Sequence, residues 1–165
     1  MIRITFFLLL ICLSACDAKN KNQRGKEEEK IAIEKIVLSD LSGNPVNLKE
    51  YKGKTVFLNF WATWCKPCLE EMPSIQKAMQ LLKSENIVFL FASEETADQI
   101  RQFEAAYDFG FNYVRVENIT ELNIMGLPTT LIYNSQGKLS FSDMGYRKWD
   151  EQSNLDMVRE IAKSK

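Results

Sequence analysis

The sequence predicts a single α/β domain in which helices flank a mixed central β-sheet and a β-hairpin precedes the core. Three observations predict this fold. An apolar run at Thr55–Trp61, typical of a buried strand, leads directly into a helical pattern. Strand and helix patterns then alternate along the chain and finish with a hairpin and a last helix. The length of 165 residues is sufficient for one domain with a substantial hydrophobic core.

The N-terminal hairpin is predicted from two short strand patterns on either side of a turn. The strands are expected at Ile33–Leu38 and Val46–Leu48, and the intervening Ser42-Gly43-Asn44-Pro45 combines residues that favour turns. Residues 49–54 would connect this hairpin to the strand at Thr55–Trp61.

The first long helix is predicted from Lys66 to Leu82 or Lys83. Its apolar residues repeat at spacings of four and three, which places them on one helix face: Cys68, Met72, Ile75, Met79 and Leu82. Pro73 lies inside this pattern and should kink the helix, because proline lacks a backbone N–H. Ile87–Ala92 is an almost unbroken apolar run, typical of a strand buried on both faces.

The rest of the chain continues the alternation. The predicted elements are a helix over Thr96–Tyr107, a strand over Asn112–Val116, a helical turn over Ile119–Ile124, hairpin strands over Thr129–Tyr133 and Leu139–Met144, and a final helix over Asp150–Ala162. The helix residues expected to face the core are Ile100, Phe103, Ala106 or Tyr107, Leu155, Val158, Ile161 and Ala162.

Composition and charge exclude several functions. The formal net charge is −1, which gives no argument for nucleic-acid binding. The chain has no histidine, so neither a Ser-His nor a Cys-His dyad can form, and no histidine can bind a metal or haem. We therefore expect no metal, no cofactor and no nucleic-acid partner.

The sequence Cys65-Lys66-Pro67-Cys68 follows the predicted strand and opens the predicted helix. The first turn of a helix has unpaired N–H groups and partial positive charge, which stabilise a thiolate and lower its pKa. Two cysteines at this spacing can also close a disulfide. Cys65 is therefore the candidate attacking thiol and Cys68 the resolving thiol. The alternatives are half of a zinc site, although no second C-x-x-C follows, and two inert core cysteines.

Two motifs in the correct order carry a resemblance to a known family. The first is the stretch from Asn59 through the C-x-x-C to Glu70-Glu71-Met72-Pro73, and the second is Gly126-Leu127-Pro128-Thr129-Thr130-Leu131-Ile132-Tyr133. Together they resemble the thioredoxin superfamily, and more closely the extracytoplasmic TlpA/ResA-like thiol–disulfide oxidoreductases. The resemblance covers residues 33–162 and implies a thioredoxin-like sandwich with an added N-terminal β-hairpin.

The resemblance implies a thiol–disulfide oxidoreductase that reduces exported proteins through a Cys65–Cys68 dithiol, with cytochrome c maturation among the pathways of the family. Its expected partners are disulfides of exported proteins and a membrane-embedded thiol donor that reduces the pair again. Two other functions remain open. A peroxiredoxin-like peroxide reductase usually needs a threonine and an arginine around one cysteine, and no such threonine motif occurs here. A redox-inactive binding module would not need both cysteines.

Pro128 is expected in a cis peptide bond beside the C-x-x-C. Only about 5–6% of X–Pro bonds are cis, so an ordinary trans turn is the alternative. In the family this proline exposes a strand edge for an extended substrate peptide, which implies substrate contacts for Leu127 and Thr129. Further substrate surface is expected from Trp64, Lys66 and Pro67. The alternatives there are core filling by tryptophan and a merely solvated lysine.

Glu71 is the candidate proton carrier. It follows Cys68 by three residues and precedes Ile75 by four, so a helix would turn it toward the core. A carboxyl group in an apolar setting has a raised pKa and can exchange a proton with Cys68. Thioredoxins usually place an acid in the preceding strand, where this chain has Asn59, whereas TlpA/ResA-like proteins often have a glutamate placed like Glu71. The alternative is an exposed helix carboxylate.

The first 30 residues are predicted to target and tether the domain. Residues 1–15 combine Arg3, an apolar run too short to span a bilayer, and small residues, which is typical of a signal peptide. Leu13-Ser14-Ala15-Cys16 resembles a bacterial lipobox and implies a lipid on Cys16, with the domain in the periplasm or on the outer face of the cytoplasmic membrane. An ordinary signal peptide or an uncleaved anchor is the alternative. Residues 16–30 would form a polar tether and residues 31–165 the domain.

Overall fold

The computed structural model describes residues 31–164, so the predictions for the signal peptide, Cys16 and the tether lie outside the described residues. The elements in chain order are η1 (Ile33–Lys35), β1 (Leu38–Ser39), β2 (Pro45–Val46), η2 (Leu48–Tyr51), β3 (Thr55–Phe60), α1 (Lys66–Leu81), β4 (Ile87–Ser93), α2 (Ala97–Ala106), β5 (Tyr113–Val116), η3 (Ile119–Leu122), β6 (Thr129–Tyr133), β7 (Leu139–Met144) and α3 (Gln152–Lys163), where η marks a 3-10 helix.

The strands form one mixed sheet in the order β2-β1-β5-β4-β3-β6-β7. The three inner strands β3, β4 and β5 run parallel, as expected for strands joined by helices. β6 runs antiparallel to β3, and β7 continues the sheet as the second strand of the predicted hairpin. The N-terminal hairpin of β1 and β2 adds to the other edge, where β1 pairs antiparallel with β5. The fold class predicted from the sequence is therefore present.

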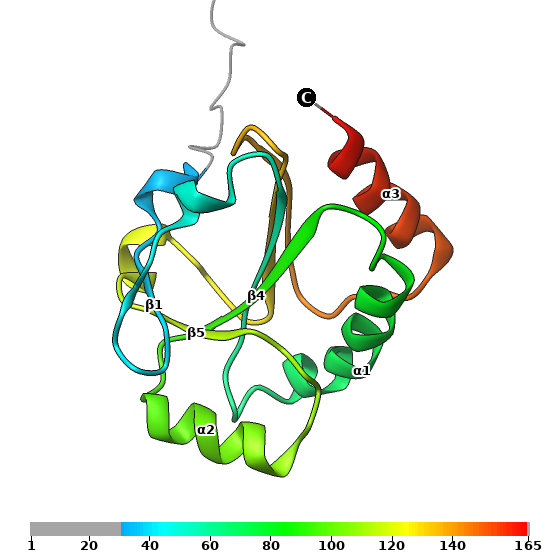
Figure 1. Ribbon diagram of the computed structural model, residues 1–165. Coiled ribbons are helices and arrows are strands. Elements are labelled where there is room, and N and C mark those ends of the chain that lie inside the picture. The colour runs from blue at the N-terminus through cyan, green and yellow to red at the C-terminus, as the bar shows by residue number, and fades with distance from the viewer. Residues whose placement is uncertain (1–30, 165) are drawn as a thin grey trace, which may run out of the picture. The chain divides into compact units, whose positions relative to one another are not determined.

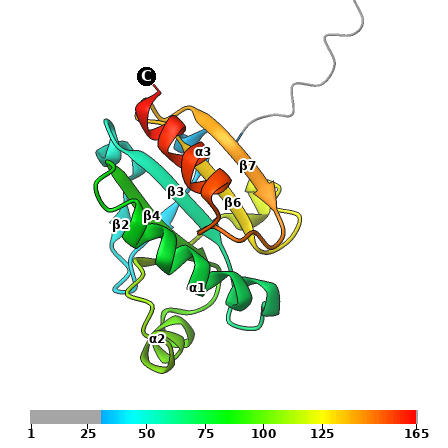
Figure 2. The ribbon, with the colours of Figure 1, turned by 90° about the vertical axis from the view of Figure 1, so that its right-hand side faces the viewer.

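A separate hydrophobic core covers each face of the sheet. The first core joins residues of α1, α2 and α3, among them Ile75, Ile100 and Val158, to one face of β3 and β4. The second core lies under the three 3-10 helices, which contribute buried residues such as Ile33, Leu48 and Leu122. Figure 1 shows α1 and α3 on one side of the sheet and the 3-10 segments on the other, and Figure 2 shows α1 and α3 side by side across the strands. β3 contributes to both cores because its side chains alternate between the faces.

Two strand predictions near the N-terminus are wrong in their bounds. Ile33–Leu38 is not a strand, because Ile33–Lys35 forms a 3-10 helix and the strand begins at Leu38. The second strand is Pro45–Val46 rather than Val46–Leu48, because the side chain of Asn47 accepts a hydrogen bond from the backbone N–H of Lys49 and starts η2. In both places a helical turn buries one apolar side chain, which a short apolar pattern does not distinguish from a strand.

Smaller corrections concern the burial of helix and strand residues. Ala106 and Tyr107 are exposed rather than turned inward, because α2 ends at Ala106 and Tyr107 stacks on Phe103 with ring centroids 4.8 Å apart. In α3, Ile161 and Ala162 are only partly buried. β4 is fully buried only in its second half, from Leu90 onward. The other predicted elements are confirmed, with bounds that differ by no more than two residues.

Candidate active site

The C-x-x-C lies where β3 passes into α1. Cys65 is the N-cap residue of α1, and its Sγ accepts a hydrogen bond from the backbone N–H of Cys68 at 3.3 Å. The two cysteines form a disulfide, as the resemblance implies. Cys65 is 4% exposed and Cys68 is 0% exposed, so a substrate can reach Cys65 first. The backbone N–H of Cys68 and the partial positive charge at the start of α1 favour the thiolate of Cys65 once the disulfide is reduced.

Lys66 and Pro67 occupy the first turn of α1 and are exposed. The ammonium of Lys66 lies 3.8 Å from the carboxylate of Glu70, and its side chain is 86% exposed. Water therefore surrounds this ion pair and screens its charges, so its electrostatic effect on the Cys65 thiolate is weak. Both residues are available to contact a substrate.

The two tryptophans around the C-x-x-C have different environments. Trp61 is 1% exposed, and its ring centroid lies 4.7 Å from that of Phe103 and 5.4 Å from that of Tyr113. Trp64, directly before Cys65, is 71% exposed. Trp61 thus packs in the core beneath the loop, whereas Trp64 is part of the surface around Cys65.

Glu95 fixes the loop that precedes Cys65, a role that the sequence reasoning missed. Its carboxylate accepts hydrogen bonds from the backbone N–H and the hydroxyl of Thr63 at 2.7 and 2.6 Å, and from the hydroxyl of Ser93 at 3.1 Å. Glu95 follows β4, the parallel neighbour of β3, so both loops leave the same edge of the sheet. A polar side chain directly after a buried parallel strand was the available signal.

Glu71 is buried, as the helical spacing predicts, and is 1% exposed. Its Oε1 accepts a hydrogen bond from Asn59 Nδ2 at 2.8 Å, and its Oε2 accepts one from the backbone N–H of Arg147 at 3.2 Å. Burial raises the pKa of Glu71 to about 7, although the hydrogen bonds from Asn59 and Arg147 favour the ionised form and oppose this rise. The side chain therefore changes its protonation state near neutral pH, in the helical turn that follows Cys68.

The segment between β7 and α3 covers Glu71, and sequence reasoning did not identify it. Arg147 is held by an ion pair with Asp143 and by a hydrogen bond from its Nη1 to Asn154 Oδ1 at 2.8 Å. Trp149 is 2% exposed, and its backbone N–H donates to the hydroxyl of Ser74 at 3.0 Å. These residues lie more than 70 positions after Glu71, and no local pattern in the sequence links them to it.

Pro128 follows a cis peptide bond, as the resemblance implies. Thr129 pairs with Phe60, the last residue of β3, so this segment reaches the same end of the sheet as the C-x-x-C. Leu127 packs against the core cluster that contains Cys65 and Cys68. β6 itself has no free edge, because it lies between β3 and β7, and the carbonyl of Pro128 already accepts a hydrogen bond from the backbone N–H of Gly145 at 2.8 Å. The strand edge expected for a substrate is therefore limited to the backbone before Pro128, at Leu127.

Exposed apolar side chains surround this segment. Met125 is 83% exposed, Met144 60% and Tyr146 52%. Met144 pairs with Thr129 across β6 and β7, and its Sδ passes so close to Gly126 that a Cβ there would lie 3.0 Å away. We define the apolar rim as Trp64, Met125, Met144 and Tyr146. Sequence reasoning identified only Trp64, because nothing in one sequence marks a methionine as exposed.

The described part of the chain has neither a metal-binding cluster nor a membrane-spanning helix. Within residues 31–164, no group of three or more Cys, Asp or Glu side chains is arranged to hold a metal ion. No helix in this range combines the length and apolar character needed to cross a bilayer.

Comparison with known proteins agrees with this geometry. A model of the AhpC/TSA family matches residues 30–142. The chain is 36% identical over 121 residues to the thiol-disulfide oxidoreductase ResA of Bacillus thuringiensis subsp. konkukian, which covers 68% of this chain and 70% of that protein. It is 32% identical over 144 residues to ResA of Bacillus subtilis, which covers 84% of this chain and 80% of that protein.

Solved structures share the fold at lower identity. A thiol:disulfide interchange protein from Bacteroides sp. superposes with a TM-score of 0.65 at 22% identity, over 78% of this chain and 86% of that chain. The arrangement of Cys65 and Cys68 at the start of α1 is the site that this fold would use for disulfide exchange. The chain therefore belongs to the AhpC/TSA family and is a thiol–disulfide oxidoreductase of the ResA type with a thioredoxin-like fold.

Proposed function

We propose that this oxidoreductase is anchored to a bacterial membrane through a lipid on Cys16 and reduces disulfides of exported polypeptides, with apocytochrome c as one candidate substrate. The observation that carries this proposal is the asymmetry of the cysteine pair. Cys65 is slightly exposed and its Sγ accepts a hydrogen bond from the backbone N–H of Cys68, whereas the side chain of Cys68 is fully buried one turn before Glu71. One thiol is thus placed to attack a substrate and the other to resolve the product.

The reaction would run in two exchange steps. The Cys65 thiolate attacks one sulfur of the substrate disulfide, forms a mixed disulfide and releases the other substrate sulfur as a thiolate. Cys68 then loses its proton and attacks the Cys65 sulfur, which releases the second substrate thiolate and closes the Cys65–Cys68 disulfide. The substrate gains two electrons and the enzyme loses two. A membrane-embedded thiol donor would reduce the enzyme again.

Glu71 would take the proton from Cys68 in the second step. Its pKa, raised by burial to about 7, allows it to accept a proton when ionised and to release one when neutral. Its place on α1, three residues after Cys68, puts both side chains on the same helix face. Asn59 and the Arg147 N–H hold the carboxylate in position.

The apolar rim supports an unfolded polypeptide as substrate. Exposed Trp64, Met125, Met144 and Tyr146 can bind apolar side chains on either side of a substrate cysteine, and such side chains are accessible in unfolded chains. Methionine adapts to different shapes, which suits several substrate sequences. Substrate backbone would pair with Leu127, beside Pro128 and Thr129.

The location outside the cytoplasmic membrane is supported by the sequence Leu13-Ser14-Ala15-Cys16 and by the cysteine chemistry. Disulfides persist in that compartment, and a lipid on Cys16 would keep its sulfur out of exchange reactions. Several acyl chains hold a protein firmly at a bilayer, since each buried CH₂ contributes about 0.8 kcal/mol.

Trapping of reaction intermediates in cells tests this function. In the full-length chain, Cys68→Ser should accumulate mixed disulfides between Cys65 and exported polypeptides, because the second step is blocked. Cys65→Ser is the matched control and should trap none. Conjugates in the membrane fraction that contain envelope proteins support the proposal, and a C-x-x-C-H segment in a trapped partner would identify an apocytochrome c. Absence of conjugates, together with rapid peroxide consumption by the wild type, would contradict it in favour of a peroxide reductase.

A further inference from the structure

The lysines of the described chain fall into two groups. Several cations form ion pairs, for example Lys77 with Asp150 at 2.9 Å and Arg101 with Asp98 at 2.9 Å. Other lysines have no carboxylate within 4.0 Å among residues 31–164. We define the lysine face as these residues: Lys49, Lys52, Lys54, Lys83 and Lys138.

The lysine face lies at the end of the sheet opposite the C-x-x-C. Lys54 directly precedes β3, whereas Cys65 follows its other end. Lys83 precedes β4, which runs parallel to β3 and starts beside it, since Thr55 N donates to Asn86 O at 2.9 Å. Lys138 lies on the β6–β7 turn, beyond the pair of Tyr133 with Val56. A six-residue strand separates the two ends by about 20 Å, at about 3.3 Å per residue.

The described chain also begins at this end. The hydroxyl of Tyr133, the last residue of β6, donates to the carbonyl of Ile31 at 2.9 Å. Gly137, with φ of +79°, lies against Ile33, where a Cβ would come within 3.3 Å of Ile33 Cγ2. The first described residue, Ile31, therefore lies beside the lysine face. In Figure 1, η1 lies at the upper left and the first turn of α1 near the bottom.

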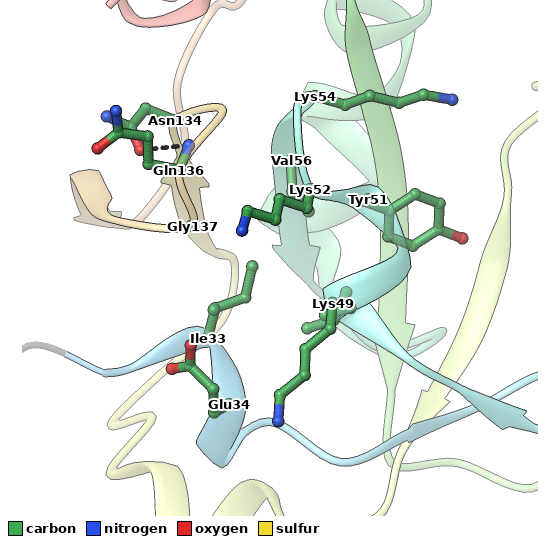
Figure 3. Close-up of a pocket in the computed structure, with 11 residues that line it drawn as sticks. Ile33, Glu34, Lys49, Tyr51, Lys52, Lys54, Val56, Asn134, Gln136 and Gly137 are labelled. Carbon is green, nitrogen blue, oxygen red and sulfur yellow. Dashed lines mark hydrogen bonds between the residues drawn. The ribbon is translucent and has the colours of Figure 1, made fainter. Parts of the chain in front are cut away.

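A cavity of about 270 Å³ opens in the lysine face. In Figure 3, the ammonium of Lys52 points into the space between Ile33 and the turn of Gln136 and Gly137, and Lys49 and Glu34 also line the cavity. Lys54 also lines the opening but points away from its centre. Glu34 is the carboxylate in this lining, and within residues 31–164 no carboxylate lies within 4.0 Å of the ammonium groups of Lys49, Lys52 or Lys54.

We propose that the lysine face is a membrane-facing surface that binds phosphate groups of anionic phospholipids and holds the Cys65–Cys68 pair on the side of the domain away from the bilayer. This rests on the proposed lipid anchor at Cys16. The segment 17–30 reaches no further than about 50 Å at about 3.5 Å per residue, so the anchored domain stays near the surface. Each lysine near an anionic leaflet raises the membrane-binding constant about fivefold. The five lysines outnumber the three glutamates at the same end, Glu34, Glu50 and Glu85.

Chemical labelling of the lipidated full-length protein tests this orientation. The protein is reconstituted in vesicles of phosphatidylcholine alone and in an equimolar mixture with phosphatidylglycerol, and a short pulse of an amine-acetylating reagent is followed by mass spectrometry. Labelling of the lysine face should be slower by at least about threefold on the anionic vesicles, because the headgroups cover those ammonium groups. Lys66, exposed at the opposite end, should label equally on both. Salt at about 1 M, where the Debye length is about 3 Å, should remove the difference.

A pair of variants supplies the matched control. Lys52→Glu/Lys54→Glu should abolish the protection of Lys49, Lys83 and Lys138. Arg101→Glu/Arg159→Glu changes the net charge equally at other positions and should keep the protection. Equal labelling of the lysine face on both vesicle types, or equal protection of Lys66, would overturn the proposal. A missing lipid anchor would give a different result: Cys16 would carry no acyl mass, and the protein would not float with phosphatidylcholine vesicles. Binding to the anionic vesicles would still test the lysine face in that case.

Discussion

Asn59 Nδ2 lies 2.8 Å from Glu71 Oε1, and both side chains are 1% exposed. The same Nδ2 donates to Thr130 Oγ1 at 3.0 Å, whereas Asn59 Oδ1 has no hydrogen-bond partner in the described chain. Rotation of the amide by about 180° would let Oδ1 accept a hydrogen bond from the O–H of protonated Glu71. Asn59 can therefore form a hydrogen bond with Glu71 in either protonation state of the carboxyl group. An ionised acid at the same strand position would have no donor for the Glu71 carboxylate and would add a second negative charge.

Glu71→Gln should stabilise the folded protein above pH 7 by up to about 3 kcal/mol, at about 1.36 kcal/mol per pKa unit. Burial raises the pKa of Glu71 from 4.5 to about 7. Between these pH values the native state binds a proton that the unfolded chain has lost, so wild-type stability falls as pH rises, and the loss is complete above pH 7. Glutamine does not titrate and avoids this loss.

Urea unfolding of both proteins across this pH range measures the effect. The difference in the free energy of unfolding should be smallest at acid pH and grow until about pH 7, the raised pKa. A difference that stays constant with pH would show that Glu71 does not titrate in this range.

Asn59→Ala should raise the pKa of Glu71 further, because the hydrogen bond from Asn59 stabilises the ionised carboxylate. Carboxyl NMR of Glu71 reports this pKa directly, and the alkylation rate of Cys68 against pH should move in the same direction. Asn134→Ala is the matched control, since Asn134 is also buried but lies at the opposite end of β6. Equal pKa values of Glu71 in Asn59→Ala and in the wild type would show that Asn59 does not stabilise the ionised carboxylate.

Met125→Ala/Met144→Ala should lower kcat/KM about thirtyfold for an unfolded disulfide-containing protein, since each methionine that a substrate covers contributes about 1 kcal/mol. Reaction with a small-molecule disulfide should be unchanged, because it does not reach the rim. Leu81→Ala is the control: Leu81 is 46% exposed at the far end of α1. Equal losses with both substrates would mean that the methionines act on the cysteines rather than on substrate binding.

Glu95→Ala should slow the first exchange step about tenfold, because the loop before Cys65 loses two hydrogen bonds of about 1 kcal/mol each and part of that loss falls on the transition state. Thr63→Val removes one of these bonds and should give a smaller effect. Amide hydrogen exchange should accelerate in residues 61–65 while β5 stays protected. Unchanged exchange in this loop would exclude the positioning role of Glu95.

The parts of the fold with strong periodicity could be predicted from the sequence. β3, α1 and the β6–β7 hairpin have long apolar patterns or a clear turn between them, and their bounds agree with the structure. The segments around Ile33 and Leu48 could not be assigned, because a strand and a 3-10 turn bury one side chain equally well. The pairing of β1 with β5 joins residues far apart in sequence and has no local signal.

The same division holds in the active site. The positions of Cys65, Cys68 and Glu71 follow from helix geometry, so their burial could be predicted from spacing. The surroundings of Glu71 could not, because Arg147 and Trp149 reach it through tertiary packing of the β7–α3 segment. Likewise, exposure of Met125 and Met144 depends on which loops lie beside them.

The reduction potential of the Cys65–Cys68 pair tests the central claim most directly. The full-length protein is equilibrated in thiol–disulfide buffers of graded potential, and the fluorescence of Trp61 and Trp64 reports the fraction reduced. A disulfide reductase should have a potential near or below that of thioredoxin, about −270 mV, and should need electrons from a membrane donor. A potential near about −120 mV would instead identify an oxidant of exported thiols and contradict the proposed direction of electron flow.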